Sequence, residues 1–475
     1  MRYTCFLLLL LSGMAGVRPA CAQDGLPAAV TQALRTAGVP ASSVSVVVQP
    51  ADSDRPLLAH QPNVAMNPAS TMKLVTTYAA LDLLGPAFRW KTSAFLEGVL
   101  RDGVLDGNLS LKGSGDPKLN LESFWVLLRA LRGKGLREIR GDVLLDRSYF
   151  ASAPGDPGGF DGDAFRPYNV LPDALLVNFK SLRFTFAPEN GAVRLAVDPR
   201  PPVLETVNVL KLVEGACPEG RAFRDSLGAT FDSAKQRAMF TGRYPASCGE
   251  KDLNVAMLEP NEYVAGVMRQ LWAEIGGTWS GGVQEARVRA GLNPFHVHES
   301  ASLAEIVRDV NKFSNNVMAR QLFLTLGAER SGPPAGGAKA SAAIKARLAQ
   351  LGVAAPELVM ENGSGLSRIE RIGAATLAAV LQLAWRSSVM PEFVASLPIA
   401  SVDGTMRRRL KGEGVSGNAH IKTGLLSDVR SSAGYVLDRQ GRRQVVVMIV
   451  NHANAVATQP AHDALLAWVY ESAPR

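Results

Sequence analysis

The chain has 475 residues, of which 47% are hydrophobic and 20% are charged, and its formal net charge is +8. This balance is typical of a globular protein and excludes an intrinsically disordered chain, and the length predicts about two or three domains. The basic residues are scattered apart from a short cluster at 407–409. A modest positive excess favours anionic surfaces such as cell wall or lipid, and it gives no indication of nucleic-acid binding.

The first residues predict export. Arg2 precedes an apolar stretch at 6–11, and positions 20–22 read Ala-Cys-Ala, which is the pattern of a secretory signal peptide. We therefore expect residues 1–22 to be removed by cleavage near Ala22, and the mature protein to reside in the periplasm. The alternative is a lipoprotein anchored through the cysteine of that site, but the residues before it lack the leucine such a signal requires. No later run of about 20 apolar residues is seen, so no membrane span is predicted.

A hairpin and a helix are predicted at the start of the mature chain. Residues 43–48 are β-branched and apolar, turn residues follow at 52–54, and 57–60 form the returning strand, which indicates a hairpin. A helix over 72–84 follows, because Pro68 is tolerated at a first turn and Gly85 ends the apolar period.

The middle of the chain, from about 91 to 293, is predicted to be rich in strands. Alternating apolar runs are separated by three turn signals, which are Asp106-Gly107, Asn190-Gly191 and Gly281-Gly282. A helical period over 263–275 interrupts these strands.

Two cysteines, Cys217 and Cys248, remain once the signal peptide is removed. In an oxidising compartment such a pair predicts one disulfide. Closing a loop of about 31 residues would stabilise the fold by roughly 3–4 kcal/mol in the chain-entropy model. The alternative is a pair of buried free thiols.

After residue 295 the helical period returns, and the chain then ends in strands. The predicted helices cover 303–310, 316–326, 342–351, 374–385 and 462–470, with a surface loop at 331–340 and strands at 419–423, 431–437 and 444–450. Strands at both ends of the chain with helices between them imply one α+β domain of antiparallel sheet flanked by helices. We assign 23–92 and 294–475 to this domain, and 93–293 to a β-rich insertion.

Three short motifs in a fixed order carry the chemistry. They are Ser70-Thr71-Met72-Lys73, Ser314-Asn315-Asn316 and Lys422-Thr423-Gly424. Each has an ordinary explanation by itself: an exposed helical pair, a helix N-cap and a strand end at the surface. A second S-x-N at 416–418 lies too close to the last motif to serve as the middle one. All three motifs in this order indicate acyl transfer through a serine activated by a lysine.

The first motif explains how that serine would be activated. Ser70 and Lys73 are three residues apart at the start of a helix, so their side chains share one face. A serine hydroxyl is a weak nucleophile until a neighbour accepts its proton, and an unprotonated lysine can do so. Because lysine titrates near 10.4, this requires a downward pKa shift of about 3 units, which burial and a second cation such as Lys422 would supply.

The trio resembles the penicillin-binding protein and serine β-lactamase superfamily. The long gap between the first two motifs is similar to that of class C low-molecular-mass members, the D-alanyl-D-alanine carboxypeptidase/endopeptidases of the penicillin-binding protein 4 type. The segments 113–117 and 362–368 also look like family segments. The resemblance covers essentially the whole mature chain and implies a β-lactamase-like transpeptidase domain whose insertion forms two nested subdomains.

The resemblance also implies a substrate and the roles of the motif residues. Ser70 would be acylated by the penultimate D-Ala carbonyl of a peptidoglycan muropeptide, or by a β-lactam antibiotic, with Lys73 as the base. Ser314 and Asn316 would relay protons to the leaving group and hold the substrate amide. Lys422 and Thr423, of the Lys422-Thr423-Gly424 strand, would bind the terminal carboxylate. The backbone N–H groups of Ser70 and Leu425 would form the oxyanion hole. Arg368 and Asp163 would contact the free end of a diaminopimelate side chain.

Several alternatives were weighed against this assignment. A β-lactamase shares the acylation machinery, but an insertion of this size is foreign to that compact class. A non-catalytic penicillin-binding wall sensor is disfavoured by the intact Lys73 and Ser314. His296 and His298 alternate on a predicted strand without a third ligand at zinc spacing, so no metal and no cofactor is expected. The sequence leaves a homodimer and peripheral membrane association open.

Overall fold

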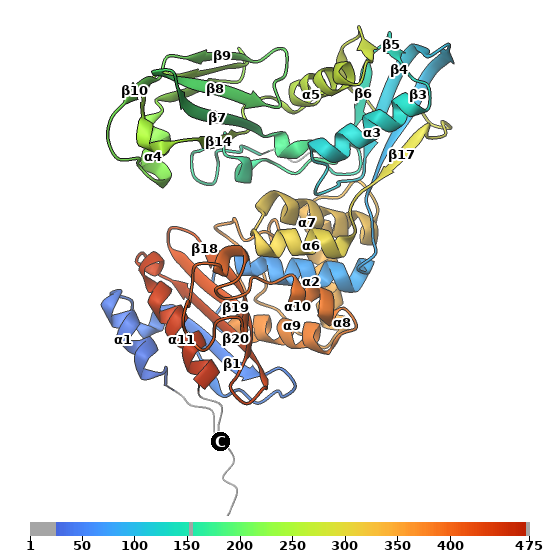
Figure 1. The fold of residues 1–475 in the computed structure, drawn as a ribbon. Coiled ribbons are helices and arrows are strands. Elements are labelled where there is room, and N and C mark those ends of the chain that lie inside the picture. The colour runs from blue at the N-terminus through green and yellow to red at the C-terminus, as the bar shows by residue number, and fades with distance from the viewer. Residues whose placement is uncertain (1–24, 152–154, 472–475) are drawn as a thin grey trace, which may run out of the picture.

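The computed structural model describes residues 25–151 and 155–471, which form two lobes joined along one side (Figure 1). The predicted signal peptide lies outside these residues. Among the described helices, none has the length and apolar character needed to cross a bilayer.

A five-stranded antiparallel sheet forms the centre of the lower lobe in Figure 1. In sheet order its strands are β18 (Ala419–Leu425), β19 (Val429–Leu437), β20 (Arg443–Asn451), β1 (Val44–Pro50) and β2 (Leu58–His60). The predicted hairpin is confirmed, since Val47 pairs with Ala59. The C-terminal strand β20 pairs with β1 along its length, with Val47 opposite Val447.

Helices cover both faces of this sheet, which explains its composition. The helices on one face are α1 (Ala28–Thr36) and α11 (Gln459–Glu471); those on the other are α2 (Met72–Leu84), α6 (Leu303–Lys312), α7 (Asn316–Ser331), α8 (Gly337–Gln350), α9 (Ala374–Arg386) and α10 (Met390–Ala395). Along β20, Val446 and Met448 face the first set, while Val445 and Val447 face the second. A strand buried on both faces reads as a continuous apolar run, as β20 does. The predicted α+β fold class is confirmed.

Helix α2 lies in the middle of the lower lobe. Every residue from Met72 to Leu81 is buried, so this helix is enclosed on all sides rather than amphipathic. Its first turn therefore stands on rigid, fully packed structure, which is what a precisely held catalytic group requires.

The upper lobe is built from the middle of the chain. Its seven-stranded sheet comprises β3 (Lys91–Arg101), β4 (Val104–Gly113), β5 (Glu138–Ile139), β6 (Val143–Asp146), β15 (Thr278–Trp279), β16 (Val283–Glu285) and β17 (His296–Glu299), with α3 (Leu121–Gly133) and α5 (Pro260–Glu274) packed on the same apolar core. Smaller sheets contain β7 (Leu182–Glu189), β8 (Ala192–Asp198) and β14 (Lys251–Val255); β9 (Glu205–Asn208), β11 (Ala229–Asp232) and β12 (Arg237–Phe240); and β10 (Lys211–Val213) with β13 (Arg243–Pro245). The short helix α4 (Gly220–Ser226) completes this lobe.

Two predictions about connections are wrong in detail. Asp106-Gly107 lies inside β4 rather than at a turn, and the chain reverses at 102–103. Gly107 faces Gly98 across the β3–β4 ladder, and a Cβ at Gly107 would come within 2.6 Å of the Gly98 Cα atom. These glycines therefore allow close backbone approach between two long strands. The predicted loop at 331–340 is also shorter, because α7 continues to Ser331 and α8 begins at Gly337.

The predicted disulfide is confirmed. Cys217 and Cys248 are bonded, with their Cα atoms 4.8 Å apart. The bond ties the segment before α4 to the 3₁₀ turn (Ala246–Cys248) that follows β13, within a part of the upper lobe made of small sheets. Such sheets bury little apolar surface each, so a covalent link between them adds stability that packing alone supplies poorly.

The division of the chain into 23–92 with 294–475 and an insertion at 93–293 remains our proposal. Strands β3 and β17 flank the insertion in the sequence and pair with each other, Thr92 opposite His298. Strand β17 lies after residue 293 and so belongs to the proposed catalytic domain, yet it pairs into the seven-stranded sheet of the upper lobe. The lobes are also joined through α7, whose Gln321 exchanges two hydrogen bonds with the backbone of Asp173 at 3.0 and 2.8 Å.

Candidate active site

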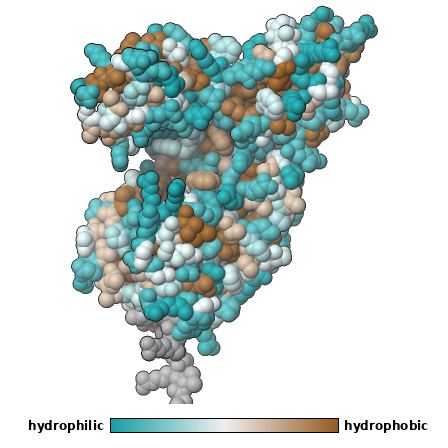
Figure 2. All heavy atoms as spheres, viewed as in Figure 1, coloured by the Kyte–Doolittle hydropathy of each residue, from teal (hydrophilic) through white to brown (hydrophobic). Residues whose placement is uncertain are grey.

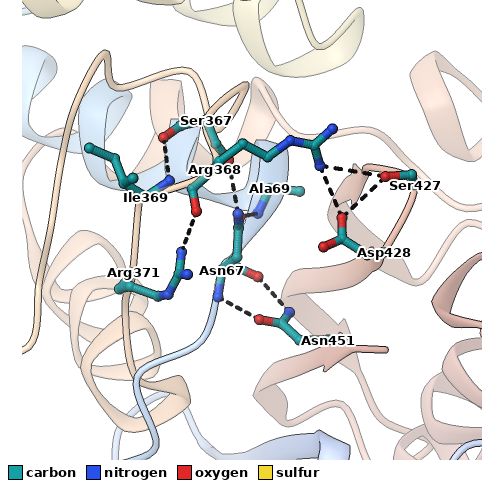
Figure 3. A network of polar contacts seen from close by, with 9 residues as sticks. All are labelled: Asn67, Ala69, Ser367, Arg368, Ile369, Arg371, Ser427, Asp428 and Asn451. Atoms are coloured by element: carbon teal, nitrogen blue, oxygen red, sulfur yellow. Dashed lines mark hydrogen bonds and ion pairs between the residues drawn. The ribbon is translucent and has the colours of Figure 1, made fainter. Parts of the chain in front are cut away.

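Ser70 lies in a 3₁₀ turn (Ala69–Thr71) that leads directly into α2. The residue before it, Ala69, has a φ of +44°, a left-handed conformation that is costly for a residue with a side chain. Asn67 holds this turn in place: its Oδ1 accepts the N–H of Ala69 at 2.9 Å, and its Nδ2 donates to the carbonyl of Ser367 at 2.8 Å (Figure 3). Two further hydrogen bonds join the Asn67 backbone to the Asn451 side chain. The strained turn next to the serine is thus held by contacts with two distant segments, at Ser367 and Asn451.

Lys73 is fully buried one turn after Ser70. Its Nζ lies 3.0 Å from Oγ of Ser70, 2.7 Å from Oδ1 of Asn316 and 2.5 Å from the carbonyl oxygen of Ser364. The asparagine oxygen and the carbonyl can only accept hydrogen bonds. A neutral amine has two N–H groups and one lone pair, so these two acceptors take the N–H groups. The lone pair then points at the Ser70 hydroxyl, which is the geometry of a general base.

The electrostatics of the site favour that neutral amine. Burial lowers the pKa of Lys73 well below its usual range, and the neighbouring cation of Lys422 lowers it further. The Glu370 carboxylate raises the pKa of Lys73 and so opposes this effect, while the charge of Arg320 lowers it by a smaller amount. The pKa of Lys73 is therefore shifted in the direction that the sequence argument requires, with burial as the main cause.

The segment 361–366 forms one wall of the site, and sequence reasoning did not identify what holds it. Oε1 of buried Glu370 accepts the backbone N–H groups of Glu361, Asn362 and Gly363 at 3.0, 3.0 and 2.8 Å. This arrangement presents the Ser364 carbonyl to Lys73. Gly365 has a φ of +79°, and a Cβ there would lie 1.8 Å from the Ala69 carbonyl oxygen. No local sequence pattern indicates this role for Glu370, because the role depends on the path of the backbone at 361–363.

In the middle motif, Ser314-Asn315-Asn316, the central residue caps a helix and the two outer residues contact the lysines of the site. Asn315 is the N-cap of α7, and its side chain accepts the N–H of Met318 at 3.0 Å. Ser314 and Asn316, on either side of it, point at the two lysines: Asn316 contacts Lys73, and Ser314 Oγ accepts a hydrogen bond from Lys422 Nζ at 2.8 Å. Ser314 has a φ of +56°, a second strained residue at this centre.

The third motif lies on β18, at the edge of the central sheet. Lys422 is fully buried and donates to Ser314 Oγ and to the Thr423 carbonyl, and burial lowers its pKa to about 7. A Cβ at Gly424 would lie 2.9 Å from the Ser70 nitrogen, so only glycine lets this strand approach the serine so closely. Leu425 follows with its side chain exposed. The backbone beside Ser70 is thus positioned to supply the N–H donors of an oxyanion hole.

Arg368 and Asp163 are placed differently. The Arg368 guanidinium stacks 4.4 Å from the ring centroid of Phe160 and forms an ion pair with Asp428 at 3.1 Å (Figure 3). Asp163 instead pairs with Arg166 at 2.5 Å. A cavity of about 460 Å³ is lined by Phe160, Arg320 and Arg368, among others, but not by Asp163. Phe160, an aromatic residue from the insertion, was missed from the sequence.

The structure thus brings the three motifs into one set of adjacent side chains. Lys73 is hydrogen-bonded to Ser70 and Asn316. Lys422 is hydrogen-bonded to Ser314 and to the Thr423 carbonyl, with Gly424 next on the same strand. Chemically this set offers a hydroxyl beside a neutral amine, a second cation that can bind a carboxylate, and backbone donors at a strand edge. Within the described residues no group of His, Cys, Asp and Glu side chains is arranged to hold a metal ion.

Comparisons with known proteins agree with this geometry. The model of the D-Ala-D-Ala carboxypeptidase 3 (S13) family matches residues 26–471. A D-alanyl-D-alanine carboxypeptidase of Actinomadura sp. is 29% identical over 405 residues, which are 82% of this chain and 73% of that protein. The D-alanyl-D-alanine carboxypeptidase DacB of Haemophilus influenzae is 24% identical over 412 residues, which are 86% of this chain and 85% of that protein.

Solved structures share the fold. The crystal structure of penicillin-binding protein 4 from Haemophilus influenzae superposes with a TM-score of 0.78 at 22% identity, covering 93% of this chain and 99% of that one. A second structure of that protein, with a TM-score of 0.73, contains a β-lactam.

Proposed function

The chain belongs to the D-Ala-D-Ala carboxypeptidase 3 (S13) family, and from that premise we propose that Ser70 is the residue that forms its acyl-enzyme. The contact between Lys73 Nζ and Ser70 Oγ at 3.0 Å carries this proposal. In this contact the nucleophile lies beside a buried amine. The amine donates its other hydrogen bonds to Asn316 and Ser364, so its lone pair points at the Ser70 hydroxyl.

The reaction would proceed in two balanced steps. Lys73 takes the proton of Ser70 while Oγ bonds to the penultimate D-Ala carbonyl carbon, and the backbone N–H groups of Ser70 and Leu425 stabilise the resulting oxyanion. The C–N bond then breaks, and the leaving amine receives a proton through Lys73 or Ser314. Water next attacks the ester, which releases the shortened peptide and restores the Ser70 hydroxyl.

Lys422 and Thr423 would bind the carboxylate of the departing residue. Lys422 donates to Ser314 Oγ, so carboxylate binding and the proton path are linked through one hydroxyl. Asn316, which already contacts Lys73, would also hold the substrate amide. Arg368 would bind a carboxylate at the third residue of the stem peptide from its position over Phe160. For Asp163 the same role would require its carboxylate to leave Arg166.

Peptidoglycan, the polymer that carries D-Ala-D-Ala, lies outside the cytoplasm, so the enzyme acts there. We propose the periplasm as its location, with removal of residues 1–22, and peptidoglycan muropeptides and β-lactams as its covalent partners. Vesicle flotation and sedimentation of the mature protein would test membrane association and a homodimer, which remain predictions from the sequence.

Release of D-alanine from a monomeric pentapeptide tests the proposal. We expect the mature wild type to release it and Ser70→Ala to release none, with unchanged circular dichroism. Ser416→Ala, at the second S-x-N of the chain, serves as the matched control and should keep wild-type activity. Equal release by Ser70→Ala and wild type would refute the role of Ser70, and nitrocefin turnover many-fold faster than D-alanine release would assign a β-lactamase instead.

A further inference from the structure

A cavity of about 890 Å³ lies between the two lobes, beside the candidate active site. The hollow is visible between the lobes in Figure 2. One wall is the segment 313–317, which includes Ser314 and Asn316 of the middle motif. The opposite wall belongs to the insertion and is formed by parts of α4, β7 and β14 and by residues 166–168.

The cavity begins where a leaving group would depart. Ser314 lines it, and Ser314 Oγ is hydrogen-bonded at 2.8 Å to Lys422, the residue that binds the departing carboxylate in the proposed function. A single D-alanine would be held by Lys422 and Thr423 and would leave most of this space unused. The size of the cavity therefore fits a leaving group that continues as a longer chain.

The lining has the chemistry of a peptide site. Tyr168 and Phe313 are 40% and 65% exposed and lie on opposite walls, where their rings could cover apolar parts of a ligand. Between them the wall carries amide side chains such as Asn254. Amide groups and aromatic faces together suit a backbone rich in N–H and C=O groups.

The cavity lining carries both positive and negative side chains, which favours a ligand with charges of both signs over a polyanion. Arg183 is paired with Asp198 at 2.8 Å, whereas Arg224 has no ion-pair partner within the described chain. Asp252, on the same wall, is exposed and accepts a hydrogen bond from Thr185. A nucleic acid would require a strongly positive groove. A chain with both carboxylates and amines, such as a peptidoglycan stem, matches a lining that offers the unpaired Arg224 guanidinium and the exposed carboxylates of Glu122 and Asp252.

The insertion wall is held rigidly against the catalytic lobe. Asn178, Phe179 and Lys180 are three consecutive residues with φ of +47°, +54° and +53°, a left-handed turn that costs of order 1–2 kcal/mol per residue. The turn is stabilised by a hydrogen bond at 3.0 Å that Asn178 Nδ2 donates to the Tyr263 hydroxyl. Phe179 lines the cavity and packs in a small apolar cluster with Val317 of α7. The two walls are therefore in direct contact through this cluster without a ligand.

We propose that this interlobe cavity binds the departing peptide strand of a cross-linked muropeptide, with Arg224 contacting one of its carboxylates. The inference rests on the proposed function, because it extends the leaving-group side of that reaction. It assigns a part of the insertion to the recognition of cross-linked substrate.

The test compares two substrates with the mature, full-length protein. One is a monomeric pentapeptide, whose leaving group is D-alanine, and the other is a D-Ala-linked muropeptide dimer. Arg224→Ala removes the unpaired cation, and Asn254→Trp fills the cavity from the exposed face of β14. For each variant we expect the ratio of kcat/KM for the dimer to kcat/KM for the pentapeptide to fall at least tenfold.

Matched controls come from the same helix, α4, and from the same sheet as β14. Arg221→Ala removes an arginine of α4 that is 86% exposed and outside the cavity, and Ala192→Trp adds a tryptophan at an exposed position of β8. Both should keep the wild-type ratio of dimer to pentapeptide cleavage. Thermal unfolding of all four variants shows whether each one folds.

The outcomes separate the inference from the proposed function. A ratio that stays within twofold of wild type in both cavity variants would overturn the inference, as would a wild type that cleaves the pentapeptide but not the dimer. A loss seen only when the dimer carries its glycan would assign the cavity to the sugar and contradict the peptide assignment. A wild type that cleaves neither substrate would refute the proposed function, and this inference with it.

Discussion

The segment 361–371 joins two regions that differ in whether their basic side chain is buried or exposed to solvent. At one end the Ser364 carbonyl binds Lys73, which is fully buried, and burial lowers the pKa of that lysine. At the other end Arg368 pairs with Asp428 while their side chains are 49% and 58% exposed. The first site removes water and converts a cation into a base, whereas the second leaves a cation in water as a binding group. Mutations should therefore have large effects at the buried end and small ones at the rim.

The largest effect is expected for Lys73→Ala. The variant loses the acceptor of the Ser70 proton, and general-base catalysis typically contributes 10²–10⁴-fold, so we expect acylation by a fluorescent penicillin to slow by about 10³-fold. Lys118→Ala, which breaks an ion pair with Asp309 at 2.5 Å away from the motifs, is the control and should react at the wild-type rate. A Lys73→Ala rate above one tenth of wild type would contradict the role of the buried amine.

The two buried lysines predict a bell-shaped pH dependence of kcat/KM. Lys73 must be neutral to act as a base, so activity falls on the acid side as it gains a proton. Lys422 must be protonated to bind the departing carboxylate, and because its pKa is about 7, kcat/KM should fall about tenfold per pH unit above that value. A substrate with an amide in place of its terminal carboxylate should lack this alkaline decline. A decline of equal steepness with both substrates would show that Lys422 is not its cause.

Glu370→Ala should have an intermediate effect on stability and on the acylation rate, because Glu370 holds the backbone at 361–363. Three N–H groups lose their acceptor, and that of Gly363 is buried, so we expect the free energy of unfolding to fall by about 2 kcal/mol and acylation to slow by about tenfold. Glu370→Gln keeps an acceptor oxygen and should retain most of both. Since the Glu370 charge raises the pKa of Lys73, the Gln variant should also extend activity to lower pH.

Chemical denaturation and pH–rate profiles measure these changes. Glu357→Ala, which removes an acceptor of the Gly373 N–H at 3.2 Å outside the site, is the control and should leave acylation unchanged. A Glu370→Gln profile identical to wild type on the acid side would contradict the electrostatic coupling to Lys73.

The smallest effect is expected at the rim. An exposed ion pair contributes about 0–1 kcal/mol, so Arg368→Ala should leave the free energy of unfolding nearly unchanged. Because Arg368 would bind a carboxylate of the stem peptide, KM for a pentapeptide with a diaminopimelate third residue should rise about fivefold. A pentapeptide with lysine there, which lacks that carboxylate, is the control. Equal KM changes for both peptides would remove the specificity role from Arg368.

The sequence predicted the site better where the chemistry is contained in a motif than where it depends on distant contacts. Ser70 and Lys73 were identified because three residues of helix put them on one face, and the two later motifs supply defined side chains. The cysteine pair was likewise predicted correctly, because few cysteines left little choice. Most helices and strands were also predicted, because the apolar runs of α2, α9 and β20 are long.

What the sequence could not reveal was set by tertiary contacts. Asn67 bonds to Ser367 and Asn451, and neither contact leaves a local pattern. The role of Glu370 depends on the path of the backbone at 361–363. Asp106-Gly107 looks like a turn, but Gly98 opposite makes it a point of close strand approach instead. The strained φ of Ser314 follows from packing between two helices rather than from its own preference.

The most direct test of this account is to locate the covalent bond. Mature protein incubated with a β-lactam and digested with a protease should give one modified peptide by mass spectrometry, with the adduct on Ser70, and Ser70→Ala should give none. An adduct on any other residue, or D-alanine release without any adduct at Ser70, would contradict the account.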